Sequence, residues 1–210
     1  MRTPRIINVA VSLALAGLTI ARIEGQQRSP DEYVKLLEGA ERVARMQVDR
    51  VVGALALKPG MKVADLGSGS GLFTRPIADG VSPGGVAYAV DIDPGLLQIV
   101  DRRAQEAGIR NITIVQAAPE DPKLPESVDL IFICDTFHHI ESRGAYLRTL
   151  RKYLNPGGRV AVIDFSESWP EGHESMRYIL AQLDEWMGEA GFRRAASHGW
   201  LENSFFVIYR

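Results

Sequence analysis

The chain has 210 residues and a formal net charge of −2, with 46% hydrophobic and 24% charged residues. This length suits one domain plus a short extension, and the composition is typical of a globular protein with a sizeable core. Lysine and arginine are not clustered, so a nucleic-acid-binding surface is not indicated. The single cysteine, Cys134, excludes an intrachain disulfide. No Cys/His spacing resembles a zinc site, so no metal is expected.

Residues 1–25 differ in composition from the rest of the chain. Arg2 and Arg5 precede an apolar run over 6–21, which ends in the small residues of Thr19-Ile20-Ala21. This layout is typical of a cleaved secretory signal peptide. A retained membrane anchor is the second interpretation, although a spanning helix needs ~20 apolar residues. An amphipathic helix packed on the domain is the third. We therefore expect an exported or membrane-associated protein, with a cytosolic domain as the open alternative.

Residues 26–55 are predicted to be mainly helical. Ser29 can cap a helix that has Pro30 at its first position. Two helices are expected, near 31–39 and 40–54, and they could fold over a bound cofactor as a lid. Three polar side chains are available to line such a lid: Arg42, Arg45 and Gln47.

Residues 56–210 alternate short apolar segments with helical patterns and are predicted to form the main domain. The expected strands are 61–66, 86–90, 112–116, 128–134, 159–165, 192–196 and 205–209. The expected helices are 72–79, 94–107, 142–154 and 174–190. The last two strands should be antiparallel because their connection is too short for a parallel crossover. The pattern predicts an α/β fold: a Rossmann-like, doubly wound, seven-stranded sheet, mostly parallel with an antiparallel last strand, and helices on both faces.

A glycine-rich stretch follows the first strand and reads Asp65-Leu66-Gly67-Ser68-Gly69-Ser70-Gly71. A strand, a glycine turn and a helix in this order bind nucleotides in doubly wound sheets. The dinucleotide fingerprint G-x-G-x-x-G does not fit, because its third glycine would fall at Leu72 or Thr74. A nicotinamide-dependent oxidoreductase is therefore the weaker interpretation of this loop.

This stretch resembles the first motif of the class I S-adenosylmethionine-dependent methyltransferases. The resemblance extends from about Leu57 to Phe165, and its further motifs are Ala89–Asp93, Val128–Ile131, Phe137–Ile140 and Leu154–Gly158. It implies a methyltransferase that uses S-adenosylmethionine to methylate a small molecule. A non-catalytic module of the same fold, which binds the cofactor or another partner, is the alternative.

The resemblance also implies a cofactor site. Asp65 would hold the ammonium group, Asp91 the ribose hydroxyls, and Ile92 would lie against the adenine. The remaining residues assigned to cofactor binding are Gly67, Ser68, Gly69, Gly71 and Asp135. Asp93 stands directly before Pro94 and is interpreted as a helix cap rather than a ligand.

The adenine edge departs from the family pattern. Ala118 occupies the position where many members carry an acid, and Pro119 has no N–H to donate. Glu120, Asp121 or a backbone carbonyl could serve instead.

Candidate acid and base groups follow the fourth and fifth predicted strands, where such sheets place their ligands. They are Asp135, His138, His139, Glu141, Asp164 and Glu167. His138 and His139 are the predicted catalytic residues, and the alternative is that one of them is a packed loop histidine. A loop at Trp169–His173 could cover the acceptor. The sequence does not indicate which acceptor is methylated or on which atom.

Overall fold

The computed structural model describes residues 29–210. The segment predicted to be a signal peptide or anchor, residues 1–25, lies outside the described residues. Within residues 29–210, no helix combines the length and the apolar character needed to cross a membrane.

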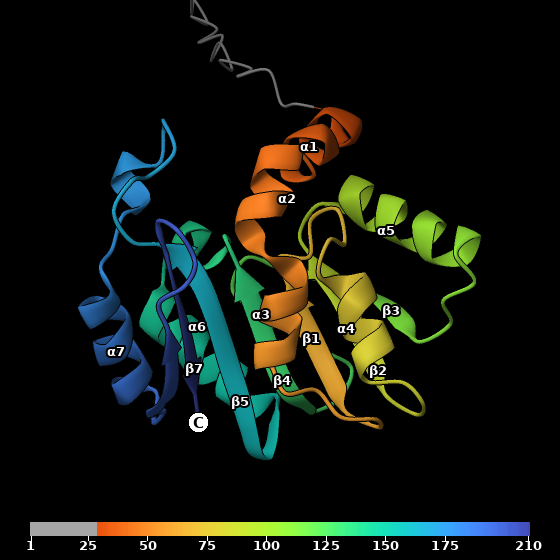
Figure 1. The fold of residues 1–210 in the computed structure, drawn as a ribbon. Helices are drawn as coiled ribbons and strands as arrows, with labels where there is room; N and C mark the ends of the chain where they lie inside the picture. Colours follow the sequence, from red (N-terminus) through yellow and green to blue (C-terminus); the bar gives the residue numbers. More distant parts are fainter. Residues whose placement is uncertain (1–28) are drawn as a thin grey trace, which may run out of the picture.

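The centre of the molecule is a seven-stranded sheet in the order β3-β2-β1-β4-β5-β7-β6 (Figure 1). Its strands are β1 Lys62–Leu66, β2 Val86–Asp91, β3 Ile112–Gln116, β4 Val128–Cys134, β5 Leu154–Phe165, β6 Arg194–His198 and β7 Ser204–Tyr209. β1 to β5 pair in parallel, and β7 is antiparallel to both β5 and β6. The predicted doubly wound sheet with a reversed last strand is confirmed.

Helices cover both faces of this sheet (Figure 1). They are α1 Pro30–Leu37, α2 Ala40–Met46, α3 Val48–Ala54, α4 Thr74–Gly80, α5 Pro94–Glu106, α6 Arg143–Lys152 and α7 Leu180–Glu189, with short 3-10 helices η1 Phe137–His139 and η2 Glu174–Met176. The helices α3 and α4 pack on one face, and α6 and α7 pack on the other. Residues 117–127 join β3 to β4 as a loop.

The core follows from the alternation of side chains along each strand. Successive strand residues point to opposite faces, so Val63 and Phe132 are buried under α3 and α4, whereas Ala64 and Ile131 are buried under α6 and α7. Both faces of the parallel strands are therefore apolar, and the polar chemistry is confined to the strand ends.

Two predicted helices differ from the structure. The helix expected over 40–54 is broken at Gln47, whose φ of 44° is left-handed. The break lets Met46 and Val51 both reach full burial, and the Gln47 side chain donates to the Trp200 carbonyl at 3.1 Å. The helix expected over 174–190 begins only at Leu180, because η2 and an extended Arg177 precede it. Tertiary packing overrides helical propensity at both places.

Asn203 fixes the chain where it leaves β5. Its Oδ1 accepts from the backbone N–H groups of Glu167 and Ser168, and its Nδ2 donates to the Ser168 carbonyl. Its own φ is 54°, a left-handed conformation that asparagine tolerates better than most residues. This side chain therefore anchors the start of segment 166–179, the light-blue stretch that rises above the sheet in Figure 1.

We predict that Asn203→Ala lowers the free energy of unfolding by about 1–2 kcal/mol, because three hydrogen bonds are lost and alanine is strained at this φ. Urea denaturation measures the change. Asn203→Gly is the matched control: it loses the same hydrogen bonds without the strain, so it should lose less stability. Equal stability of Asn203→Ala and the wild type would contradict this account.

Candidate functional site

A cavity of about 770 Å³ opens at the carboxyl ends of β1, β2 and β4. The glycine loop, the start of α5, the loop after β3 and the segment after β4 form its walls. Tyr33, Leu37 and Arg42 of the N-terminal helices line it as well. The volume is within the range of about 300–1,000 Å³ that is typical of small-molecule sites. The cavity lies where ligands bind in open α/β sheets.

The glycine loop depends on the absence of side chains at its alternate positions. Gly67, Gly69 and Gly71 have φ values of 76°, 52° and 79°. A Cβ on Gly67 would lie 2.2 Å from the Thr136 hydroxyl oxygen, and one on Gly69 would lie 2.8 Å from Leu37. Only glycine permits both the left-handed backbone and this close packing.

Asp91, at the end of β2, holds the glycine loop in place. Its carboxylate accepts from the Gly69 amide at 2.9 Å and from the Asp93 amide at 3.0 Å. Burial raises its pKa. Each oxygen retains acceptor capacity, so the side chain can still bind hydroxyl groups that enter the cavity. The neighbouring Ile92 lines the cavity with an exposed side chain. Asp93 caps α5 by accepting from the Gly95 amide at 2.7 Å, as predicted.

Asp65, at the end of β1, is a buried carboxylate on the cavity wall. Its exposed fraction is 2%, and Oδ2 accepts from the Thr74 hydroxyl at 2.5 Å. Burial raises its pKa to about 7, and the nearby Asp91 charge adds to the effect. Among the described residues, the buried hydroxyls of Ser68 and Ser70 have no hydrogen-bond partner. Carboxylate and hydroxyl groups here are suited to a polar, cationic ligand.

An ion pair connects the N-terminal helices to the sheet. Arg42 of α2 donates to the Asp135 carboxylate at 2.8 Å and to the Leu37 carbonyl at 2.7 Å. Asp135 directly follows β4, with a left-handed φ of 49°. Its other carboxylate oxygen, Oδ1, is buried without a partner in the described chain. Of the polar residues offered for a lid, Arg42 lines the cavity, whereas Arg45 and Gln47 are absent from its walls.

The loop after β3, where the sequence analysis places the edge of the adenine, contains a tight backbone turn. Ala118 and Asp121 pair through their backbones, and the Asp121 side chain accepts from the Tyr153 hydroxyl at 2.8 Å. Glu120 lines the cavity together with Ala118 and Pro119, whereas Asp121 does not. Of the two acids considered for this edge, Glu120 is therefore the one within reach of a ligand.

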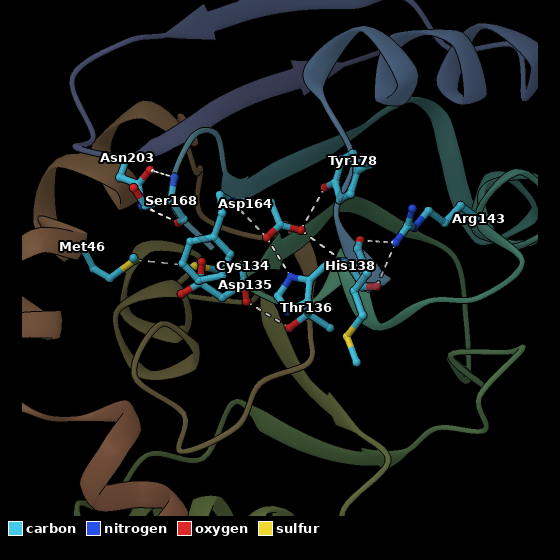
Figure 2. A network of polar contacts seen from close by, with 12 residues as sticks. Met46, Cys134, Asp135, Thr136, His138, Arg143, Asp164, Ser168, Tyr178 and Asn203 are labelled. Atoms are coloured by element: carbon cyan, nitrogen blue, oxygen red, sulfur yellow. Dashed lines mark hydrogen bonds and ion pairs between the residues drawn. The ribbon is translucent and has the colours of Figure 1, made fainter. Parts of the chain in front are cut away.

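The two predicted catalytic histidines lie in different surroundings. His138 is 2% exposed and does not line the cavity. Its Nδ1 donates to Asp164 at 2.8 Å, and Tyr178 donates to the other oxygen of the same carboxylate, as Figure 2 shows. His139 lines the cavity, and its partial burial beside His138 and His173 lowers its pKa to about 4.

The other candidate acids likewise divide into one that lines the cavity and two that do not. Glu141 lines the cavity, whereas Asp164 is fully buried behind it and Glu167 lies outside its walls.

Sequence reasoning missed Thr74 and Thr136, because no motif marks a hydroxyl that supports a carboxylate or a glycine. It also missed the approach of His173 to His138 and His139, which lie 35 and 34 residues earlier in the chain.

Comparison with known proteins agrees with this geometry. The family described as "Methyltransferase domain" matches residues 64–162. Residues 64–162 thus carry a methyltransferase domain of the S-adenosylmethionine-dependent class I kind, and S-adenosylmethionine is the cofactor of this family. The predicted resemblance is thereby confirmed.

The chain is similar to curated proteins named "Ubiquinone/menaquinone biosynthesis C-methyltransferase UbiE". It is 26% identical to the one from Burkholderia cenocepacia over 70% of this chain and 61% of the relative. It is 32% identical to the one from Shewanella sp. over 79% of this chain and 66% of the relative. The chain thus spans about six-tenths of the length of the first of these relatives.

Solved structures show the same fold. A SAM-dependent methyltransferase from Aquifex aeolicus superposes with a TM-score of 0.77 at 22% identity, covering 87% of this chain and 98% of that one. Magnesium protoporphyrin IX methyltransferase from Synechocystis, crystallised with bound SAM, gives a TM-score of 0.62 at 19% identity over 89% and 85% of the two chains.

The buried Asp65 carboxylate leads to a prediction about stability. Burial raises the pKa of this carboxyl from its usual 3.8 to about 7. Between these values the folded state binds more protons than the unfolded state, so the free energy of unfolding falls as the pH rises. We expect ligand-free Asp65→Asn to be more stable than the wild type at about pH 8, by about 1–4 kcal/mol, and similar at about pH 4.

Urea denaturation at several pH values measures this difference. Asp101→Asn, which removes an exposed carboxylate from α5, is the control and should leave the pH dependence unchanged. If Asp65→Asn is less stable than the wild type at about pH 8, the prediction is wrong. The hydrogen bonds of the buried carboxylate would then outweigh the cost of burying its charge.

Proposed function

We propose that this protein transfers the methyl group of S-adenosylmethionine to a small acceptor bound in the same cavity. The observation that carries the proposal is the charge of the cavity wall. Asp65, Asp91 and Asp135 all reach it from the ends of adjacent strands, and Arg42 neutralises only Asp135. A cofactor with an ammonium and a sulfonium group suits such a wall, whereas the pyrophosphate of a dinucleotide would face like charges.

The contacts of each residue support specific roles toward the cofactor. Asp65 would accept from the ammonium group, and this cation would lower the raised pKa of its carboxyl. The carboxylate of Asp91 would accept from the ribose hydroxyls while it holds the Gly69 amide. Ile92 would pack on the adenine, with Glu120 at the edge of the ring. The unpartnered Ser68 hydroxyl and the backbone N–H groups beside Gly67, Gly69 and Gly71 would complete the cradle. The free oxygen of Asp135 would face the methionine portion.

S-adenosylmethionine, when bound, supplies an activated methyl group and its own leaving group. The chain then has to align the acceptor, exclude water and remove a proton where the acceptor carries one. His139 and Glu141 line the cavity beside Asp135 and are the groups placed for that proton. The pKa of His139, lowered to about 4, keeps its imidazole neutral at pH 7, where it is only a weak proton acceptor. His138 would instead act through its neighbours, because its ring is buried behind the cavity.

The acceptor that this cavity favours is small and largely apolar. Tyr33, Leu37, Ile140 and Tyr146 provide apolar surface in the lining of the cavity. The names of the curated relatives refer to ubiquinone and menaquinone biosynthesis, and a lipophilic aromatic acceptor agrees with both observations.

We predict that Asp91→Ala weakens the binding of S-adenosylhomocysteine by about 1–3 kcal/mol, which is about 5–150-fold, because a charge-assisted hydrogen bond is lost. Asp65→Ala should have an effect of similar size. Isothermal titration calorimetry measures both, with Asp101→Ala as the surface control. Unchanged affinity in both site variants would refute the assignment of the cavity.

Thermal-shift measurements with S-adenosylhomocysteine and with NAD separate the alternatives. We expect stabilisation by S-adenosylhomocysteine alone. A shift with NAD alone would indicate an oxidoreductase, and a shift with neither would indicate an interaction module. Release of S-adenosylhomocysteine in the presence of lipophilic phenols and quinols tests catalysis itself; its absence despite tight binding would favour the non-catalytic alternative.

We further propose that residues 1–25 direct the protein to a membrane, as a cleaved signal or a retained anchor. The basic start and the apolar run 6–21 support this. Fusing residues 1–40 to a periplasmic reporter tests it, and we expect reporter activity if the segment is exported. A fusion of residues 26–40 is the matched control. An inactive reporter together with membrane-bound protein would identify a retained anchor with the domain inside.

A further inference from the structure

Three of the four histidines of the chain come together at the edge of the cavity, which His139 lines. His138 and His139 belong to η1, and His173 comes from segment 166–179, which follows β5. One ring nitrogen from each lies within 4.8 Å of the other two. The ring centroids of His138 and His173 are 5.3 Å apart, and those of His139 and His173 are 5.5 Å apart.

The hydrogen bonds of two of these rings determine which nitrogen is free. The Nδ1 atom of His138 faces the Asp164 carboxylate at 2.8 Å, and the Nδ1 atom of His173 faces the Glu171 carbonyl at 3.2 Å. Carboxylate and carbonyl oxygens only accept, so both Nδ1 atoms must carry the proton. In the neutral form of each ring, the lone pair is therefore on Nε2 of His138 and of His173. Nε2 of His138 is buried and has no hydrogen-bond partner among residues 29–210.

A buried imidazole with one engaged and one free nitrogen has the form of a metal ligand. Ligating histidines almost always donate their other N–H to a carboxylate or a backbone carbonyl, which orients the ring. Asp164 is itself fixed, because it also accepts from the Tyr178 hydroxyl and from the backbone amides of His138 and Phe165. Its position is set by four donors, so it holds the His138 ring rigidly.

We propose that His138, His139 and His173 bind a divalent transition-metal ion, with Zn²⁺ as the best match. Three imidazole ligands leave one position of a tetrahedral ion for water or another oxygen ligand. Ligand nitrogens around such an ion are about 3.4 Å apart. The present separations therefore require side-chain rotations of the more exposed His139 and His173, while His138 stays in place.

The ion would join two segments that are distant in the chain. It would tie segment 166–179 to η1, at a point where His139 also lines the cavity. Trp169 already packs on the His138 ring from the same segment, with centroids 5.5 Å apart. A bound ion would occupy the lone pair of His139, which leaves Glu141 as the cavity group for a proton from the acceptor. Metal binding and methyl transfer can still be measured separately.

Metal binding to full-length protein tests the proposal, with the protein produced without a histidine tag and treated with a chelator. We expect about one equivalent of Zn²⁺ by calorimetry, and visible absorption typical of four-coordinate Co²⁺ when Co²⁺ is the probe. His173→Asn should weaken Zn²⁺ binding at least about tenfold. His198→Asn is the matched control, because it changes the one histidine outside the cluster, and it should bind as the wild type does.

Limited proteolysis adds a readout that does not depend on affinity. Zn²⁺ should protect segment 166–179 from cleavage in the wild type and in His198→Asn, but not in His173→Asn. Absence of binding to the wild type, unchanged affinity in His173→Asn, or an equal loss in His198→Asn would each overturn the proposal. Binding of S-adenosylhomocysteine, measured on the same samples, shows whether each variant has kept its fold.

Discussion

The hydrogen bond from the Gly69 amide to the Asp91 carboxylate holds the glycine-loop side of the cavity together. It joins the loop after β1 to the end of β2, two strands that are neighbours in the parallel sheet. The Gly67 and Ser68 amides add bonds to the Val90 carbonyl, so the loop folds back over the strand ends. Such an approach leaves no space for side chains: Thr136 and Leu37 occupy the places where Cβ atoms would stand. The glycines therefore serve packing as much as backbone freedom.

The same constraint extends to the N-terminal helices. Leu37 of α1 packs against Gly69, and Arg42 of α2 pairs with Asp135 after β4. The cavity is thus closed by a segment that precedes the sheet in sequence. The left-handed break at Gln47 makes this arrangement possible, because it turns α2 away from α3. Met46 can then pack near Cys134 while α3 continues along the face of the sheet.

Much of the sheet could be predicted from the sequence, because most strands are apolar runs and most connections contain glycine, proline or a capping acid. The strand at 128–134 and the Asp93 cap were predicted as the structure has them. The break at Gln47 and the late start of α7 could not be predicted, because no local signal opposes a helix there. The pairing of Arg42 with Asp135 joins residues 93 positions apart, and such contacts exist only in the folded chain.

His138 and His139 show why adjacent residues of one motif should not be given one role. In η1 the chain turns about a third of the way round per residue, so neighbouring side chains point in different directions. One ring is directed to the buried Asp164 and the other to the cavity. In the proposed reaction a proton from the acceptor would reach His139, whereas His138 has its Nδ1 engaged and its ring enclosed. A substitution at His138 therefore perturbs the position of η1 and, through it, His139, so its effect on activity cannot be read as loss of a base.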